Sequence, residues 1–162
     1  MKNSVKKKNN ISDYQHYLNC CSLNGIPEAI TTEYMKYMLT LDYIVLNQDR
    51  HYNNFGVIRD SKTFEIIGHA PVYNTGTSLW NGIAFPFIGN SKYEESKPFK
   101  SKQEEQINIL GVSEYFSYKI LEGVEDEFND LLKKSVYITS DRRDRLVRCF
   151  RNRIDKIFGV RM

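Results

Sequence analysis

The chain has 162 residues, of which 41% are hydrophobic, 27% charged and 13% aromatic. That length is typical of a single domain, and the composition favours a packed core over a disordered chain. No apolar stretch is long enough to span a bilayer, and no apolar segment follows the lysine-rich N-terminus. We therefore predict no membrane span and no signal peptide, and a cytoplasmic location.

The net charge of +3 is unevenly distributed. Residues 1–10 contain four lysines and no acidic residue, and residues 140–162 contain eight basic residues against three aspartates. The remaining residues, 11–139, carry a net charge of −6. Basic ends on an acidic body could contact nucleic acid or an acidic partner. The alternative is a disordered basic tail over 1–10 and a solvated helix face near the C-terminus.

The three cysteines indicate a reduced protein. Their number is odd, and Cys20 and Cys21 are adjacent, where a disulfide framework would not place them. No Cys-x-x-Cys or paired-histidine spacing occurs, so we predict no metal site of that type.

The first elements expected in the chain are two helices. Ser12 is the expected N-cap of a helix over residues 13–24, which Gly25 ends. The second helix is expected from about Thr32 to Leu46. Its apolar residues extend over most of its circumference, which is typical of a buried helix.

That second helix contains one acidic residue, Asp42, seven positions before Asp49. A buried carboxylate needs a partner. We expect Asp42 to brace the following loop through Arg50 or His51, a structural role and not a catalytic one.

The following loop reads Asp49-Arg50-His51-Tyr52-Asn53-Asn54. Phosphoryl transfer to a hydroxyl needs a carboxylate that accepts the hydroxyl proton, and a nearby side-chain oxygen that holds Mg²⁺ against the nucleotide phosphates. Asp49 and Asn54 have the Asp-x-x-x-x-Asn spacing of protein kinases. The alternative is an ordinary polar turn, in which Asp49 is a cap.

A β-hairpin is expected over residues 55–69, because two apolar runs flank a turn at 60–63. The stretch Ala70-Pro71-Val72-Tyr73-Asn74-Thr75-Gly76 follows it. A loop, a hairpin and a second loop return the chain to its starting point. Asp49, Asn54 and Asn74 are therefore expected to converge on one cleft.

The segment after Asn74 contains Trp80, Phe85 and Phe87, so it is apolar enough to dock against the domain or a partner. Residues 89–100 are expected to be a loop. A capping-box pattern at Ser101–Glu104 predicts a helix to Leu110.

Three more helices are expected after that one. Ser113 is the expected cap of a short helix through Leu121, and another is expected over residues 124–134. The last helix is expected over 141–158. Its apolar stripe consists of Leu146, Val147, Phe150, Ile154, Ile157 and Phe158. Its opposite face carries Arg142, Arg143, Arg145, Arg148, Arg151 and Arg153.

On these motifs the chain resembles the HipA-like Ser/Thr kinases, a bacterial family that includes toxins of toxin–antitoxin pairs. The resemblance covers roughly residues 11–158 and rests on the stretches LDYIVLNQDRHYNNFGVIRD and APVYNTGTSLW. Phosphoinositide kinases also carry an Asp-Arg-His-x-x-Asn loop, but the Ala-Pro-x-Tyr and Gly-Thr-Ser-Leu-Trp stretches fit the HipA-like group better.

The resemblance implies an α+β, mostly α-helical fold over residues 11–160, namely a protein-kinase-like C-terminal lobe with one β-hairpin. It also implies Mg²⁺ and ATP as cofactors. The catalytic residues that it implies are Asp49, Arg50 and His51, where His51 holds the loop by hydrogen bonding. The metal ligands that it implies are Asn54 and Asn74.

Two departures from the family bear on activity. The family usually has Asp at the position of Asn74, and an amide brings no negative charge to a metal. No Gly-rich loop and no strand with a phosphate-pairing lysine precede residue 49, so the N-terminal lobe is expected to be absent. We therefore expect the isolated chain to bind Mg·ATP weakly or not at all.

Two functions remain open at this stage. The chain could be a kinase C-terminal lobe that is inactive alone and is completed by a separate N-lobe chain. It could instead be a degenerate kinase lobe, a pseudokinase, that acts as a protein-binding or regulatory module. A separate N-lobe or an antitoxin-like protein is the expected partner. An exposed apolar patch on the nucleotide side would favour a separate N-lobe chain.

Overall fold

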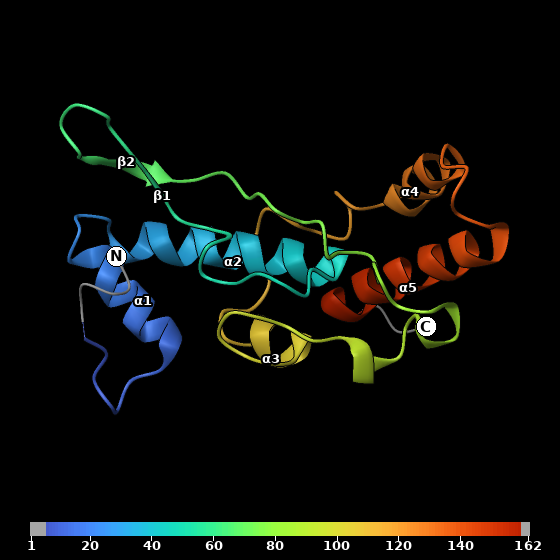
Figure 1. The fold of residues 1–162 in the computed structure, drawn as a ribbon, viewed down its shortest axis with the longest axis horizontal. Coiled ribbons are helices and arrows are strands. Elements are labelled where there is room, and N and C mark those ends of the chain that lie inside the picture. Colours follow the sequence, from blue (N-terminus) through green and yellow to red (C-terminus); the bar gives the residue numbers. More distant parts are fainter. Residues whose placement is uncertain (1–5, 160–162) are drawn as a thin grey trace.

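The computed structural model describes residues 6–159, in which one long helix, α2, packs against three of the other helices (Figure 1). Helix α1 contacts α2, and α3 and α5 also contact α2, while α4 packs on α5. The hairpin lies at the same end of α2 as α1 (Figure 1). In chain order the elements are α1 (Asp13–Ser22), α2 (Glu28–Val45), β1 (Val57–Arg59), β2 (Ile66–His69), α3 (Gln103–Ile107), α4 (Val124–Lys133) and α5 (Ser140–Phe158).

Helix α2 begins at Glu28, earlier than the Thr32 expected from the sequence. Pro27 is the N-cap residue, with φ −57° and ψ 140°, and its side chain has no polar atom that could cap the helix. The helix ends where Leu46 adopts the left-handed conformation at φ 52°, a position that glycine usually fills. Leu46 is fully buried, so its packing holds this turn and directs the chain into the polar loop that follows.

Two hydrophobic clusters lie along α2. One is built on Met35, Met38, Leu39 and Phe55, with rings from α1 packed against it. The other joins the C-terminal end of α2 to α4 and α5 and contains Ile44, Leu46, Trp80, Ile88, Phe128, Leu132, Leu146, Cys149, Phe150 and Ile154. The apolar stripe expected on the last helix is confirmed, because its buried members Leu146, Phe150 and Ile154 belong to this cluster.

The expected hairpin is confirmed. Its strands are antiparallel, with Val57 opposite His69 and an irregularity in register after Ile58. Asp60 holds the turn, since its Oδ1 accepts hydrogen bonds from the amides of residues 62 and 63 at 2.8 Å. The ring of His69 stacks on Tyr34 of α2 at 4.2 Å between centroids, which fixes the hairpin against that helix.

Between the hairpin and α4, one predicted helix is shorter than expected and another does not form. Helix α3 has only five residues and starts after Lys102, with no side-chain cap, so the capping box at Ser101 does not form. The predicted helix from Ser113 to Leu121 is a series of turns. Its backbone is engaged elsewhere, because the amide of Ser113 donates to Thr40 Oγ1 of α2 at 2.9 Å. The ring of Phe116 packs on Tyr37 of the same helix.

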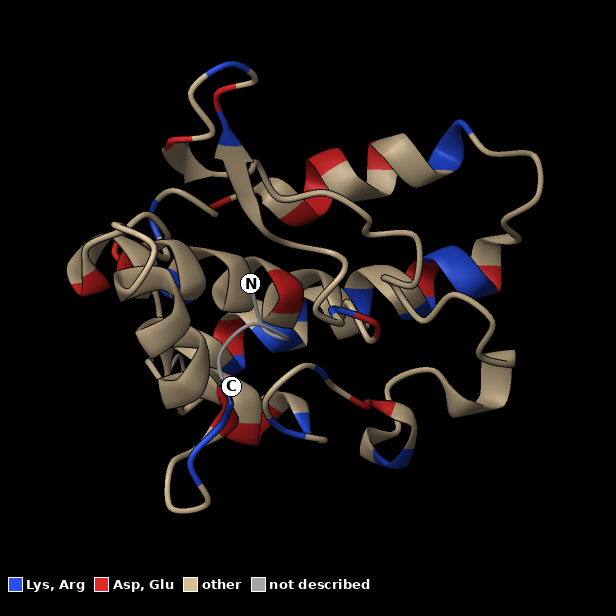
Figure 2. Ribbon diagram, turned by 60° about the vertical axis from the view of Figure 1, so that its left-hand side comes forward, with Lys and Arg blue, Asp and Glu red and all other residues tan. Residues whose placement is uncertain are grey.

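The arginines of α5 do not form the solvated basic face considered from the sequence. Arg142 donates to the carbonyls of Ile83 and Trp80 at 3.1 and 3.2 Å, and Arg145 donates to that of Ile88 at 3.0 Å. Arg153 is buried, donates to a carbonyl of α2 at 2.6 Å and pairs with Glu94 at 2.8 Å. Figure 2 shows basic and acidic positions interspersed over the ribbon.

Residues 1–5 of the expected basic tail lie outside the described residues. Lys7, which is described, pairs with Asp13 at 2.6 Å at the start of α1. All three cysteines are free and buried. Within residues 6–159, no helix is long and apolar enough to cross a membrane, and no group of three or more His, Cys, Asp or Glu residues is placed to hold a metal ion.

Candidate functional site

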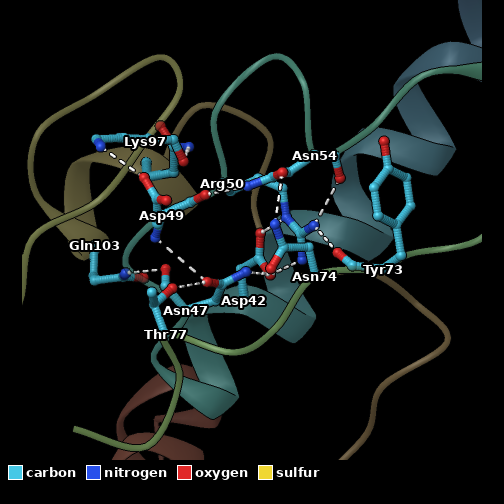
Figure 3. A network of polar contacts seen from close by, with 11 residues as sticks. Asp42, Asn47, Asp49, Arg50, Asn54, Tyr73, Asn74, Thr77, Lys97 and Gln103 are labelled. Carbon is cyan, nitrogen blue, oxygen red and sulfur yellow. Dashed lines mark hydrogen bonds and ion pairs between the residues drawn. The ribbon is translucent and has the colours of Figure 1, made fainter. Parts of the chain in front are cut away.

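The loop over residues 47–54 starts at the left-handed turn of Leu46, and its first residue anchors it to α2. Asn47 is 1% exposed. Its Nδ2 donates to Asp42 Oδ1 at 3.0 Å, and its Oδ1 accepts from Thr77 Oγ1 at 2.9 Å (Figure 3). Asn47 therefore joins α2 to the chain that follows the hairpin.

Arg50 is the centre of the loop, and its side chain is fully buried. Its Nε and one terminal nitrogen donate to the two oxygens of Asp42 at 2.8 and 2.7 Å. Its other terminal nitrogen donates to the carbonyl of Asn54 at 2.8 Å and to that of Tyr73. Bidentate, charge-assisted pairs of this kind are strong and directional. The expectation that Asp42 braces the loop through Arg50 is confirmed.

The two candidate metal ligands lie side by side. Asn74 Nδ2 donates to Asn54 Oδ1 at 2.8 Å, and Asn54 Nδ2 donates to the backbone carbonyl of Asp49 at 2.7 Å. Asn54 is buried, whereas Asn74 is exposed and adopts φ 56°, a left-handed value that Asn tolerates. The loop and the segment after the hairpin therefore converge, as the chain order predicts.

The carboxylate of Asp49 points away from this amide pair. Its Oδ1 lies 2.7 Å from Lys97 Nζ, and its Oδ2 lies 3.7 Å from His51 Nε2 (Figure 3). The hydrogen bond from Lys97 lowers the pKa of the Asp49 carboxyl below its usual value. Asp49 reaches Asn54 through its backbone carbonyl, so the three side chains share one region without forming one set of ligands.

His51 acts within its own loop. Its Nδ1 accepts a hydrogen bond from the amide of Asn53 at 3.2 Å, and its side chain is 42% exposed. This contact agrees with the expectation that His51 holds the loop by hydrogen bonding.

Lys97 is the residue of this site that sequence reasoning missed. It lies 48 positions after Asp49 in a polar loop, and nothing in the local pattern distinguishes it from the neighbouring lysines. No sequence signal marks this pair, because the fold alone brings Lys97 to the carboxylate of Asp49.

A cavity of about 650 Å³ lies beside the loop, between α1 and the start of the hairpin. Its lining combines aromatic rings with polar side chains and consists of Asp13, His16, Tyr17, Cys20, Tyr52, Asn53, Phe55, Gly56, Val57 and Arg59. A volume of this size can accommodate a small organic ligand.

No family model and no curated protein matches the sequence. Among solved structures, the chain is similar to the crystal structure of the Helicobacter pylori proinflammatory kinase CtkA, with a TM-score of 0.64. The chain has a kinase-like fold. Sequence identity is 14%, so the likeness concerns the fold alone. The match covers 97% of this chain but 64% of the Helicobacter chain, so this chain spans less than two thirds of the structure it resembles.

Proposed function

We propose that the chain is the C-terminal lobe of a HipA-like Ser/Thr protein kinase that transfers no phosphoryl group unaided. A separate N-lobe chain would complete it for ATP-dependent transfer to a protein hydroxyl. The observation that carries this proposal is the Arg50 brace, which holds residues 49–54 and the segment at Asn74 together at the end of the hairpin. Phosphoryl transfer depends almost entirely on such positioning and on electrostatic stabilisation.

In this proposal Asp49 is the base that orients the acceptor hydroxyl. Its side chain is 37% exposed, so a protein substrate can reach it. Arg50 acts only by positioning, because all of its hydrogen bonds go to Asp42 and to backbone carbonyls. His51 keeps the loop in shape from its exposed side.

The residues at the metal position do not fit Mg²⁺ well. Magnesium is usually held by one or two carboxylates together with substrate phosphates. Asn54 and Asn74 are neutral amides, and the oxygen of Asn54 already accepts the hydrogen bond from Asn74. We therefore propose that the isolated chain binds Mg·ATP weakly, and we derive no catalytic step through the metal.

A nucleotide would need contacts beyond this chain. The cavity beside Tyr52 and Phe55 offers aromatic and polar surface, but the described residues include no phosphate-binding loop before Asp49. Cradling of the phosphates is the role that we assign to the separate N-lobe chain.

The second candidate function is a pseudokinase module that binds or regulates a protein. Two contacts favour it, namely the amide pair of Asn54 with Asn74 and the ion pair of Asp49 with Lys97. Both satisfy polar groups of the site from within the chain, so the site is stable without metal or nucleotide. An antitoxin-like protein is a candidate partner for either function.

The test is the substitution Asn74→Asp, which replaces the donor by a carboxylate. Two oxygens would then face each other across the present 2.8 Å contact. Neighbouring ligands of an octahedral Mg²⁺ are about 3 Å apart, so the metal would fit between them. Without Mg²⁺ the variant should melt below the wild type, because the hydrogen bond is lost and two acceptor oxygens face each other.

With Mg²⁺ at about ten times its dissociation constant, the variant should gain about 1.4 kcal/mol, or about 3–6 °C. The matched control is Asn53→Asp, which adds the same charge at an exposed neighbouring position. A Mg²⁺ gain confined to Asn74→Asp supports a silenced kinase metal site. Equal responses in both variants and the wild type would overturn the kinase proposal and leave the binding module.

A further inference from the structure

Three glutamines hold residues 93–97 against the candidate site. The side-chain amides of Gln48, Gln103 and Gln106 donate to the carbonyls of residues 93, 95 and 97, respectively. Residue 93 ends a 3-10 turn at Ser91–Tyr93, so the three amides fix the chain as it leaves that turn. Gln103 also donates to the carbonyl of Asn47 at 3.0 Å, which ties this segment to the loop that carries Asp49.

The chain then turns back on itself and is fixed a second time. The amide of Ser96 donates to the carbonyl of Ser101 at 3.0 Å. Gln106 Oε1 accepts from the amides of Phe99 and Lys100 at 3.2 and 2.8 Å. Gln103 and Gln106 are both 3% exposed, so these contacts are shielded from water. The segment is therefore a preformed loop.

We call residues 92–102 the lysine loop, because it carries Lys92, Lys97, Lys100 and Lys102, all exposed. Of its two acids, Glu94 is taken up by Arg153 at 2.8 Å, and only Glu95 is exposed. Lys97 pairs with Asp49, whereas the other three lysines have no ion pair with any residue that the structure describes. Residues 95–102 line a surface hollow of about 510 Å³.

We propose that the lysine loop binds an acidic segment of a protein and places it beside Asp49. That the bound segment also carries the accepting hydroxyl rests on the proposed kinase function, whereas the binding itself does not. The lysine loop thus defines the substrate class as hydroxyl-bearing segments rich in Asp and Glu.

The ion pair at Asp49 supplies the first reason. A hydroxyl that approaches Asp49 must take the place of the Lys97 ammonium, which lies 2.7 Å from the carboxylate. Lys97 is 53% exposed, so water can solvate the displaced ammonium, and a carboxylate of the incoming segment can pair with it. An acidic partner therefore gains an ion pair from this exchange that a neutral partner does not.

The surroundings supply the second reason. Phe85 and Phe87 are 46% and 43% exposed, and the ring of Phe87 packs on Tyr93 of the lysine loop at 4.9 Å between centroids. Exposed aromatic rings beside lysines suit a protein segment that combines acidic and apolar residues. Nucleic acid would need a longer basic track, and Arg142, Arg145 and Arg153 of α5 are occupied within the fold.

The experiment measures fluorescence anisotropy of a fluorescein-labelled peptide, Gly-Glu-Glu-Ser-Glu-Phe-Glu-Gly, titrated with the full chain in the absence of ATP. The same peptide with Lys in place of Glu and a labelled oligothymidine are the comparison probes. We expect the acidic peptide alone to bind, and to bind more weakly as NaCl rises, because added salt screens exposed charges.

The informative variant neutralises the three lysines without an internal partner, Lys92→Gln, Lys100→Gln and Lys102→Gln together. Each exposed pair contributes modestly, so the combined loss should be on the order of tenfold in affinity. The matched control neutralises three exposed lysines elsewhere, Lys62→Gln, Lys119→Gln and Lys134→Gln, and should leave the affinity unchanged. Thermal melting of both variants checks that they fold.

Three results would overturn the proposal. The acidic peptide could fail to bind at about 0.5 mM chain, a concentration that detects even millimolar affinities. The loop variant and the control could bind the peptide equally well. The oligothymidine could bind more tightly than the peptide, which would make the loop a nucleic-acid contact. Because no ATP is present, loss of the kinase function leaves these outcomes unchanged.

Discussion

The Arg50 brace makes the sharpest prediction about stability. Asp42→Asn keeps the size of the side chain but removes its charge. In the wild type, Asp42 receives two hydrogen bonds from Arg50, at 2.7 and 2.8 Å, and one from Asn47 at 3.0 Å. The Arg50 side chain is 0% exposed, so water cannot replace the lost carboxylate. The substitution therefore leaves a buried guanidinium without its counter-charge.

The expected loss follows from that geometry. Removing one partner of a buried ion pair costs about 3–5 kcal/mol. A domain of this size has a total stability of about 5–15 kcal/mol, so the variant should remain folded but close to its limit. At about 2–4 °C per kcal/mol, the melting temperature should fall by about 10 °C.

Urea unfolding and thermal melting, followed by circular dichroism, measure this loss. Lys97→Gln is the matched control, because it removes an ion pair of similar length, 2.7 Å, between side chains that are 53% and 37% exposed. That control should cost much less than Asp42→Asn, because solvent screens an exposed ion pair. The double variant Asp42→Leu with Arg50→Met removes both buried charges and should lose less than Asp42→Asn alone. Equal, small losses in Asp42→Asn and Lys97→Gln would refute the account of the brace.

Two further predictions concern the surroundings of the site. Gly89→Ala should destabilise the chain by about 1–3 kcal/mol more than Gly111→Ala. Both glycines have positive φ, so the backbone strain is similar. A Cβ at Gly89 would lie 2.6 Å from Cys149 Sγ, whereas a Cβ at Gly111 would meet nothing within 4 Å. Combining each variant with Cys149→Ala should remove the difference in stability, which urea unfolding measures. A difference that remained in the Cys149→Ala background would contradict the steric explanation. Lys97 lowers the pKa of Asp49 in the folded chain, so the ion pair stabilises the fold above the unfolded pKa of about 4, and this contribution is lost as pH falls through the folded value. Lys97→Gln should raise the pKa of Asp49, measured by carboxyl-carbon NMR titration, and should flatten the decline in stability at acid pH; an unchanged pKa would mean that the ion pair does not form in solution.

Much of the fold could be predicted from local patterns. The periodic apolar residues of α5 lie within one short segment, and the structure places that helix at Ser140–Phe158, within one residue of the expected start. The hairpin was predictable for the same reason, because its turn at Asp60 and both of its strands are close in sequence. Local patterns fail where a distant residue takes the hydrogen bond that a helix would need. At Ser113, for example, the backbone amide donates a hydrogen bond to Thr40 Oγ1 of α2.

Part of the candidate site could likewise be predicted from the sequence, and part could not. The spacing of Asp49 and Asn54 and the need of Asp42 for a partner follow from local sequence, because a buried carboxylate must be paired whatever the fold. The chain order also predicts that the loop and Asn74 meet, since a hairpin returns the chain to its start.

The charged side chains that surround the site depend on how distant elements pack. Lys97 reaches Asp49 across 48 positions of sequence, held there by buried glutamines of α3. Arg142 and Arg145 of α5 bind carbonyls of the segment around Ile83 and Ile88 instead of facing solvent. A long, flexible side chain has no periodic pattern that reveals its partner, and its contact depends on where separate elements pack. Hydrophobic periodicity therefore determined the helices of this protein, whereas packing determined the electrostatics of its site.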